Sequence, residues 1–167
     1  MFNHPVRAVH FLLALVVVLL DRWTKRLVAV HVPMYTEKQV IPGFFRITHT
    51  ENTGAAFSLF ADSHSHWTAV LLIAFSALAM LVVFALLWKQ KHGLSITGIG
   101  LSLILGGALG NLWDRVASGR VIDFLLFYIG QYRWPVFNLA DSAIVVGASL
   151  LVIEIIFHKA PKDQAIV

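Results

Sequence analysis

The chain has 167 residues, of which 58% are hydrophobic and 13% are charged, and its mean hydropathy is +0.77. This composition lies outside the range of soluble domains and indicates an integral membrane protein. Cysteine is absent, which excludes disulfides, thiolate nucleophiles and Cys-ligated metals. The net charge of +4 does not predict a nucleic acid partner, because the basic residues stand singly or in short groups beside apolar runs.

Four segments are long enough to cross a hydrocarbon core of about 30 Å as helices. We place these spans at about residues 6–30, 67–88, 94–113 and 136–157. The first is apolar only as far as Leu20, where DRWTKR follows. Its basic start is typical of a signal peptide, but no small-residue cleavage site follows, so we expect a mature helix. Without an internal repeat or linker, residues 1–167 are predicted to form one membrane-embedded domain.

Two longer connections join the spans. The first contains IPGFFRITHTENTGAAFSLF, residues 41–60, whose β-branched and aromatic residues predict a short strand or hairpin. We expect a turn at Asn52-Thr53-Gly54, and the AAFSLF end is apolar enough to lie along the bilayer surface. The second connection, residues 114–135, carries aromatic residues typical of a membrane interface and ends at Pro135.

Basic residues close to the spans predict the orientation. They occur at the N-terminus, in the short loop of residues 89–93 and in the C-terminal tail, as Arg7, Lys89, Lys91, Lys159 and Lys162. An even number of spans places these three regions on one side, which is cytoplasmic by the positive-inside rule. Both long connections then lie outside, where basic residues also occur but at lower density.

Polar residues gather near the outer ends of three spans. At a rise of about 1.5 Å per residue, Asp21 lies about 20 Å along the first span from Arg7, and Lys25 is one turn further. The others at this depth are Asn111, Asp114, Arg115, Asp123, Asn138 and Asp141. Four aspartates are thus expected at one membrane level, whereas Glu154 lies at the cytoplasmic end and can be solvated there. Charged residues inside membrane helices are costly, and they are usually functional.

Structural roles can explain each feature taken alone. Asp21 and Lys25 can form an ion pair on one helix surface. The motif N-L-x-D, at residues 111–114 and 138–141, can serve helix ends or packing, and Asp123 can be an ordinary loop acid. The GGALG run that begins at residue 106 is typical of close helix packing. The eight histidines show no i, i+4 pair that predicts a metal site.

The coincidence of these acids at one level favours chemistry. Two carboxylates held close in a low-dielectric site share a proton, so that one can activate water while the other donates to a carbonyl oxygen. This is the division of labour in aspartic proteases. Spacing alone leaves Asp114 and Asp123 as alternative partners of Asp141. No Ser/Lys or Ser/His set is an obvious alternative at this level, although Ser58, Ser142 and Lys25 prevent a strict exclusion.

The chain resembles the lipoprotein signal peptidases, the bacterial signal peptidase II family. The matching blocks, in the order of the family, are DRWTK, ENTGAAFS, GGALGNLWDR, GRVIDF and FNLADSAI, which begin at residues 21, 51, 106, 119 and 137. The third and fifth are highly specific together, and no departure from the motifs is evident. The resemblance implies an all-α integral membrane protein with four transmembrane helices, a small extracytoplasmic β-rich cradle and an interfacial helix.

The resemblance also implies a function. Members are intramembrane aspartic endopeptidases that remove the signal peptide from diacylglyceryl-modified prolipoproteins, on the amino side of the lipidated Cys. The resemblance assigns the catalytic roles to Asp123 and Asp141. It assigns supporting roles to Asp21, Lys25, Asn52, Gly54, Asn111, Asp114, Arg115, Asn138 and Ala140. We then expect Arg115 to form a salt bridge with Asp114, in preference to contact with a phosphate headgroup.

The expected partners and location follow from the same resemblance. They are prolipoprotein signal peptides, membrane lipids and globomycin-type inhibitors, with no cofactor and no metal. The expected location is the bacterial cytoplasmic (inner) membrane, with both termini in the cytoplasm and the site near the outer face.

Two other functions stay open from the residues alone. Intramembrane acids also build proton relays, which suits a small proton-coupled transporter or channel. Against it, transporters usually have a midplane site and two matching halves, and this chain has neither. A non-catalytic membrane scaffold is the second alternative.

Overall fold

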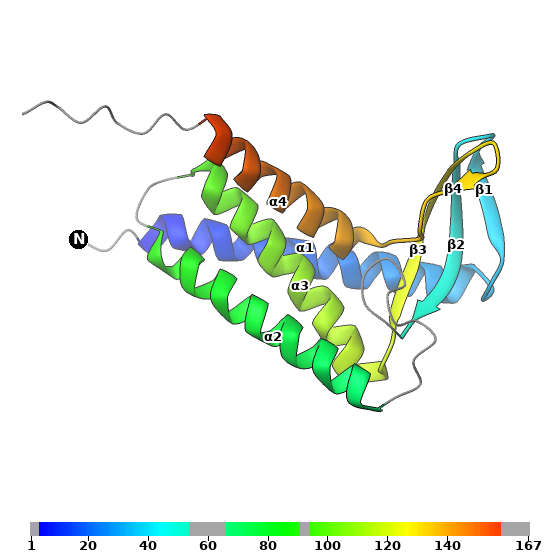
Figure 1. Ribbon diagram of the computed structural model, residues 1–167, viewed down its shortest axis with the longest axis horizontal. Coiled ribbons are helices and arrows are strands. Elements are labelled where there is room, and N and C mark those ends of the chain that lie inside the picture. The colour runs from blue at the N-terminus through cyan, green and yellow to red at the C-terminus, as the bar shows by residue number, and fades with distance from the viewer. Residues whose placement is uncertain (1–3, 54–65, 91–93, 158–167) are drawn as a thin grey trace, which may run out of the picture.

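Four helices form a bundle and a small sheet lies at one end of it (Figure 1). The computed structural model describes residues 4–53, 66–90 and 94–157. The helices are α1 (His4–His31), α2 (His66–Lys89), α3 (Ile96–Ser118) and α4 (Leu139–Phe157). The strands are β1 (Glu37–Ile41), β2 (Phe45–Asn52), β3 (Val121–Ile129) and β4 (Tyr132–Arg133).

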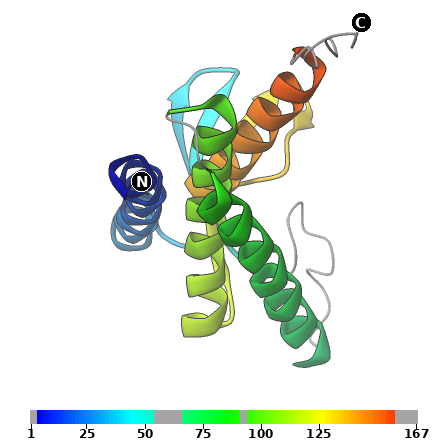
Figure 2. The ribbon, with the colours of Figure 1, turned by 90° about the vertical axis from the view of Figure 1, so that its left-hand side faces the viewer.

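Helix α3 is the centre of the bundle and packs against the three other helices, as Figure 2 shows. Its glycines permit this close approach. A Cβ atom on Gly106 would lie 2.7 Å from the Ala14 carbonyl oxygen of α1, and one on Gly100 would lie 2.8 Å from the Gly147 carbonyl oxygen of α4. The predicted packing role of the GGALG run is therefore confirmed.

The ends of α3 and α4 differ from the predicted spans. Helix α3 continues to Ser118, where Gly119 adopts φ 71° and donates its N–H to the Arg115 carbonyl oxygen at 3.0 Å. This left-handed residue ends the helix at little steric cost because glycine has no Cβ. Helix α4 begins at Leu139 rather than at residue 136. The Asn138 side chain accepts the Asp141 N–H at 3.0 Å and caps α4.

The sheet is antiparallel with the order β1-β2-β3-β4. The predicted hairpin is confirmed, and its turn lies at residues 42–44, where Gly43 has φ 75°. The turn expected at Asn52-Thr53-Gly54 falls partly outside the described residues and stays a prediction. Strand β2 ends at Asn52, and Gly54 and the AAFSLF segment lie outside the described residues. Strand β3 occupies the connection that was expected only to be interfacial, and its Asp123 pairs with Thr50 of β2.

Two helices, α3 and α4, are long and apolar enough to cross a membrane. In α2 the apolar helical stretch found among the described residues is Ile73–Lys89, which is shorter than these two helices. Helix α1 has four charged side chains within the segment of residues 21–26. The expectation of four transmembrane helices therefore stays a prediction for α1 and α2.

Candidate active site

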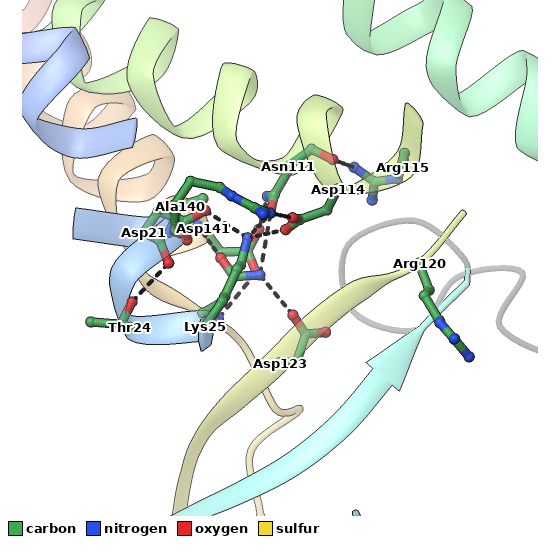
Figure 3. Close-up of polar contacts among 12 residues, drawn as sticks. Asp21, Thr24, Lys25, Asn111, Asp114, Arg115, Arg120, Asp123, Ala140 and Asp141 are labelled. Atoms are coloured by element: carbon green, nitrogen blue, oxygen red, sulfur yellow. Dashed lines mark hydrogen bonds and ion pairs between the residues drawn. The ribbon is translucent and has the colours of Figure 1, made fainter. Parts of the chain in front are cut away.

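A buried polar network lies where α1, α3, α4 and β3 meet (Figure 3). Most of its side chains are fully or nearly fully buried, and they are Asp21, Lys25, Asn111, Asp114, Asp123 and Asn138. Asp141 is partly buried beside them. Buried polar groups are costly unless they are bonded, so the contacts within the network decide whether it is stable.

Lys25 is the cation at the centre of this network. Its side chain is 2% exposed, and its Nζ donates to Asp21 Oδ2 at 2.7 Å, to Asn111 Oδ1 at 3.0 Å and to Asp114 Oδ2 at 2.7 Å. These acceptors use all three N–H donors of an ammonium group. The predicted ion pair with Asp21 is confirmed, but it is buried rather than on a helix surface. The bonds from Lys25 to Asn111 and Asp114 join α1 to α3.

Asp21 also reaches α4. Its Oδ1 atom accepts the backbone N–H of Ala140 at 3.0 Å, in the first turn of that helix. Such an N–H has no partner inside its own helix, and a carboxylate is favoured at a helix N-terminus. The close approach requires Gly110, because a Cβ there would lie 2.6 Å from Asp21 Oδ2. One aspartate therefore fixes the position of α4 relative to α1 and α3.

Asp123 is held by amide groups. Its side chain on β3 accepts from Asn138 Nδ2 at 2.7 Å and from Asn52 Nδ2 at 3.0 Å, and the residue is 4% exposed. Burial raises the pKa of Asp123 to about 6, the negative charge of Asp141 adds to the rise, and the two amide bonds oppose it. The alternative of an ordinary loop acid is wrong, since the residue is buried on a strand.

Asp141 lies in the first turn of α4, where the helix dipole favours a negative charge. Its Oδ1 accepts from Asn111 Nδ2 at 2.8 Å, and its Oδ2 accepts the Asn138 N–H at 3.3 Å. Asn138 in turn accepts the Asp141 N–H through its side-chain oxygen. Asn138 is thus bonded to both Asp123 and Asp141, and it holds the two carboxyl groups in one site.

Asp114 has a different environment. Its carboxylate forms ion pairs with Lys25 and with Arg22 of α1. The predicted salt bridge between Asp114 and Arg115 is not among the ion pairs of the described residues. Arg115 donates from Nη1 to the Asn111 carbonyl oxygen at 3.4 Å. Arg22 was missed as a member of the network. Its place after Asp21 in DRWTK did not indicate that it would reach α3.

The two candidate partners of Asp141 have different neighbours. The bonded groups around the Asp114 carboxylate are cations, whereas those around Asp123 within the described residues are neutral amides. A carboxyl group that must hold a proton is better placed among amides in a buried site. All the predicted site residues within the described part lie in this network or bond to it, and Gly54 lies outside that part.

Comparison with known proteins decides the family. A family model for signal peptidase (SPase) II matches residues 13–157. This chain belongs to the signal peptidase II family. The resemblance drawn from the motifs is therefore confirmed, and with it a membrane-bound protease of lipoprotein processing.

Individual relatives agree with this family. A lipoprotein signal peptidase of Solibacter usitatus is 47% identical over 146 residues, which cover 87% of each chain. One of Desulforapulum autotrophicum is 40% identical over 150 residues, which cover 90% of this chain and 93% of that one. A solved bacterial membrane enzyme, determined by the in meso method at 2.3 Å resolution, has a TM-score of 0.83 at 28% identity. The match covers 99% of this chain and 96% of the other.

Proposed function

We propose that this signal peptidase II is an aspartic endopeptidase that removes the signal peptide from diacylglyceryl-modified prolipoproteins. It cleaves on the amino side of the lipidated Cys. Family membership and the names of the relatives support the substrate class. The single structural observation that carries the aspartic mechanism is that Asn138 bonds to two carboxyl groups, Asp123 of β3 and Asp141 of α4.

The two carboxyl groups take different roles. In the reactive form of the enzyme Asp123, whose pKa burial raises to about 6, carries the proton, and Asp141, in the first turn of α4, acts as the base. Asp141 accepts a proton from a water molecule as the water oxygen attacks the scissile carbonyl carbon, and Asp123 donates its proton to the carbonyl oxygen. A neutral tetrahedral diol forms.

Collapse of the diol completes the reaction. Asp141 returns its proton to the amide nitrogen, the C–N bond breaks, and Asp123 recovers a proton from the diol hydroxyl as the new carboxyl group forms. The products are the signal peptide with a free carboxyl terminus and the lipoprotein with a free amino group on its Cys. Both aspartates regain their starting protonation, so the cycle needs no other reactant than water.

The remaining polar residues position this pair. Asn111 donates to Asp141 and is itself tied to Lys25, whereas Asn52 donates to Asp123. The Lys25 ammonium group has all three N–H donors bonded to Asp21, Asn111 and Asp114, so we give it a supporting role and not that of a base or nucleophile. We assign supporting roles to these residues, to Arg115 and to Ala140, and we extend the same role to Gly54 from its motif.

The membrane brings the substrate to the site. A diacylglyceryl group and an apolar signal helix confine the prolipoprotein to the bilayer, since burial of each methylene contributes about 0.8 kcal/mol. The peptide then enters laterally between helices rather than from water. In the proposed orientation both termini are cytoplasmic, the sheet is outside, and the scissile bond meets the aspartates near the outer face.

The decisive test is the incubation of the purified protein with lipidated and unlipidated forms of one prolipoprotein. Cleavage of the lipidated form alone, before its Cys, is expected. A pH-dependent ion flux in proteoliposomes without cleavage would instead favour a proton-coupled transporter or channel. Binding of substrate without cleavage, unchanged when both Asp123 and Asp141 are replaced, would favour a scaffold.

A further inference from the structure

A groove of about 580 Å³ lies at the end of the bundle that is remote from the sheet. It lies between α2, α3 and α4, and its walls are largely apolar. The lining residues used below are Leu86, Gln90, Thr97, Leu101, Leu151 and Glu154. None of them belongs to the network around Asp123 and Asp141, so the proposed mechanism leaves this groove without a role.

Glu154 is the charged side chain of the groove. It is partly buried, and one of its oxygens accepts a hydrogen bond from the Thr97 hydroxyl of α3. Among the residues that the structure describes, no Lys or Arg forms an ion pair with it. A carboxylate held against apolar walls is stabilised by a cation. Glu154 can therefore pair with a cationic group of a ligand whose neighbouring segment is apolar.

A signal peptide has this combination of properties. It begins with a positively charged n-region, which is followed by an apolar h-region of about 7–15 residues. As a helix, such an h-region is about 10–22 Å long. The basic end would lie at the cytoplasmic side and the cleavage site at the outer side.

The separation between Glu154 and the proposed catalytic site matches this length. Asp141 and Glu154 both lie on α4, at the two ends of the helix. The thirteen residues from one to the other correspond to about 20 Å along the helix axis. A signal peptide whose scissile bond is at Asp141 would therefore place its n-region at the depth of Glu154.

We propose that the groove between α2, α3 and α4 binds the amino-terminal end of the signal peptide, and that Glu154 pairs with the basic n-region. This inference rests on the proposed function, because it names a second contact for the same substrate. Leu86, Leu101 and Leu151 contact the start of the h-region. Glu154 is thus a specificity residue that acts on binding and not on the chemical step.

The test uses the full chain and two lipidated prolipoproteins that differ only in the n-region, with two lysines in one and two glutamines in the other. For the unsubstituted enzyme, KM should be about fivefold higher for the glutamine substrate, the upper range for an exposed ion pair, with kcat unchanged. Glu154→Gln should remove this difference. Glu154→Lys should make the glutamine substrate the better one.

Glu37→Gln is the matched control. Glu37 lies on β1 at the opposite end of the molecule, and its loss should leave the n-region preference intact. If Glu154→Gln retains the preference, or if the unsubstituted enzyme has none, the inference is wrong. If Glu154→Lys does not fold, the glutamine variant alone decides the question. Failure of the unsubstituted enzyme to cleave either substrate would count against the proposed function instead.

Discussion

Asn138 has the most specific task of any single side chain in the site. Its amide nitrogen donates to Asp123, its amide oxygen accepts from the Asp141 backbone, and its own N–H bonds to the Asp141 carboxylate. The residue therefore fixes the end of α4 and the orientation of both carboxyl groups at once. A shift of Asn138 would displace both carboxyl groups, and misplacement of a reacting group by about 1 Å can reduce a rate about 10²-fold.

The first prediction concerns the two aspartates. Asp123→Asn and Asp141→Asn should each reduce turnover by at least about 10²-fold, because an amide has the shape of the acid but cannot cycle a proton. Both proteins should stay folded, as measured by thermal unfolding in detergent. Asp114→Asn is the informative comparison. If it is inactive with its fold intact while Asp123→Asn cleaves normally, the partner of Asp141 has been misassigned.

The second prediction concerns the pH profile. The bond from Asn52 favours the ionised form of Asp123 and opposes the rise of its pKa. Asn52→Ala should therefore raise the pKa of Asp123 above about 6. If protonated Asp123 is the active form, kcat/KM falls on the alkaline side of that pKa, and this limb of the profile should move to higher pH in the variant.

Thr50→Val provides the control for this profile. The Thr50 hydroxyl bonds to the backbone oxygen of Asp123 at 3.0 Å and not to its carboxyl group, so the alkaline limb should keep its position. An alkaline limb that keeps its position in Asn52→Ala while the acidic limb moves to higher pH would show that the roles of the two aspartates are reversed, because Asp123 would then be the required base.

At the scale of elements, hydropathy predicted the helices well and the strands poorly. Apolar length alone located α2, within a residue or so of each end. Strand β3 was missed, although VIDFLLFYI is β-branched and aromatic between two glycines, because its partner β2 lies far away in the sequence. The extra turn of α3 was also missed, since its charged end is too polar to be recognised as part of a span.

The third prediction tests the contact between α3 and α4. A methyl group on Gly107 would meet the Ala140 carbonyl oxygen, next to Asp141, and would lie 2.8 Å from Ile144 Cγ1. Gly107→Ala should therefore cost about 1–3 kcal/mol of stability, as overpacking does, and displace Asp141. A lower melting temperature and a lower kcat are expected together.

Val116→Ala is the control on the same helix, because Val116 is 69% exposed and should tolerate the change. If Gly107→Ala keeps the kcat and the melting temperature of the parent, the packing of α4 on α3 does not position the site.

At the scale of the whole molecule, the fourth prediction concerns orientation. Reporter fusions after residue 92 and at the C-terminus should report the cytoplasm, and fusions near residues 50 and 125 should report the outer side. The first two sites follow the basic loop and tail, and the last two lie on β2 and β3. Fusions with the opposite pattern would place the proposed site on the wrong face of the membrane.

The gathering of the acids could be predicted from the chain, but their bonding could not. Helical rise and the ends of the spans placed Asp21, Asp114, Asp123 and Asp141 at one level, and the structure brings them into one network. The contacts of Lys25 with Asn111 and Asp114 depend on how α1 rotates against α3, which no local pattern encodes. The Arg22 ion pair was unpredictable for the same reason.

The position of Lys25 also has a consequence for biosynthesis. Of the partners of Lys25 described above, only Asp21 exists when α1 emerges from the ribosome, because it lies on the same helix. Charges inside a membrane usually pair with one another, and this pair is available to α1 from the start. Asn111 and Asp114 arrive with α3, and the Ala140 N–H that Asp21 needs arrives with α4. The nascent enzyme therefore acquires its proposed catalytic pair only when α4 docks, and we expect no cleavage by a chain in which α4 has not yet been made.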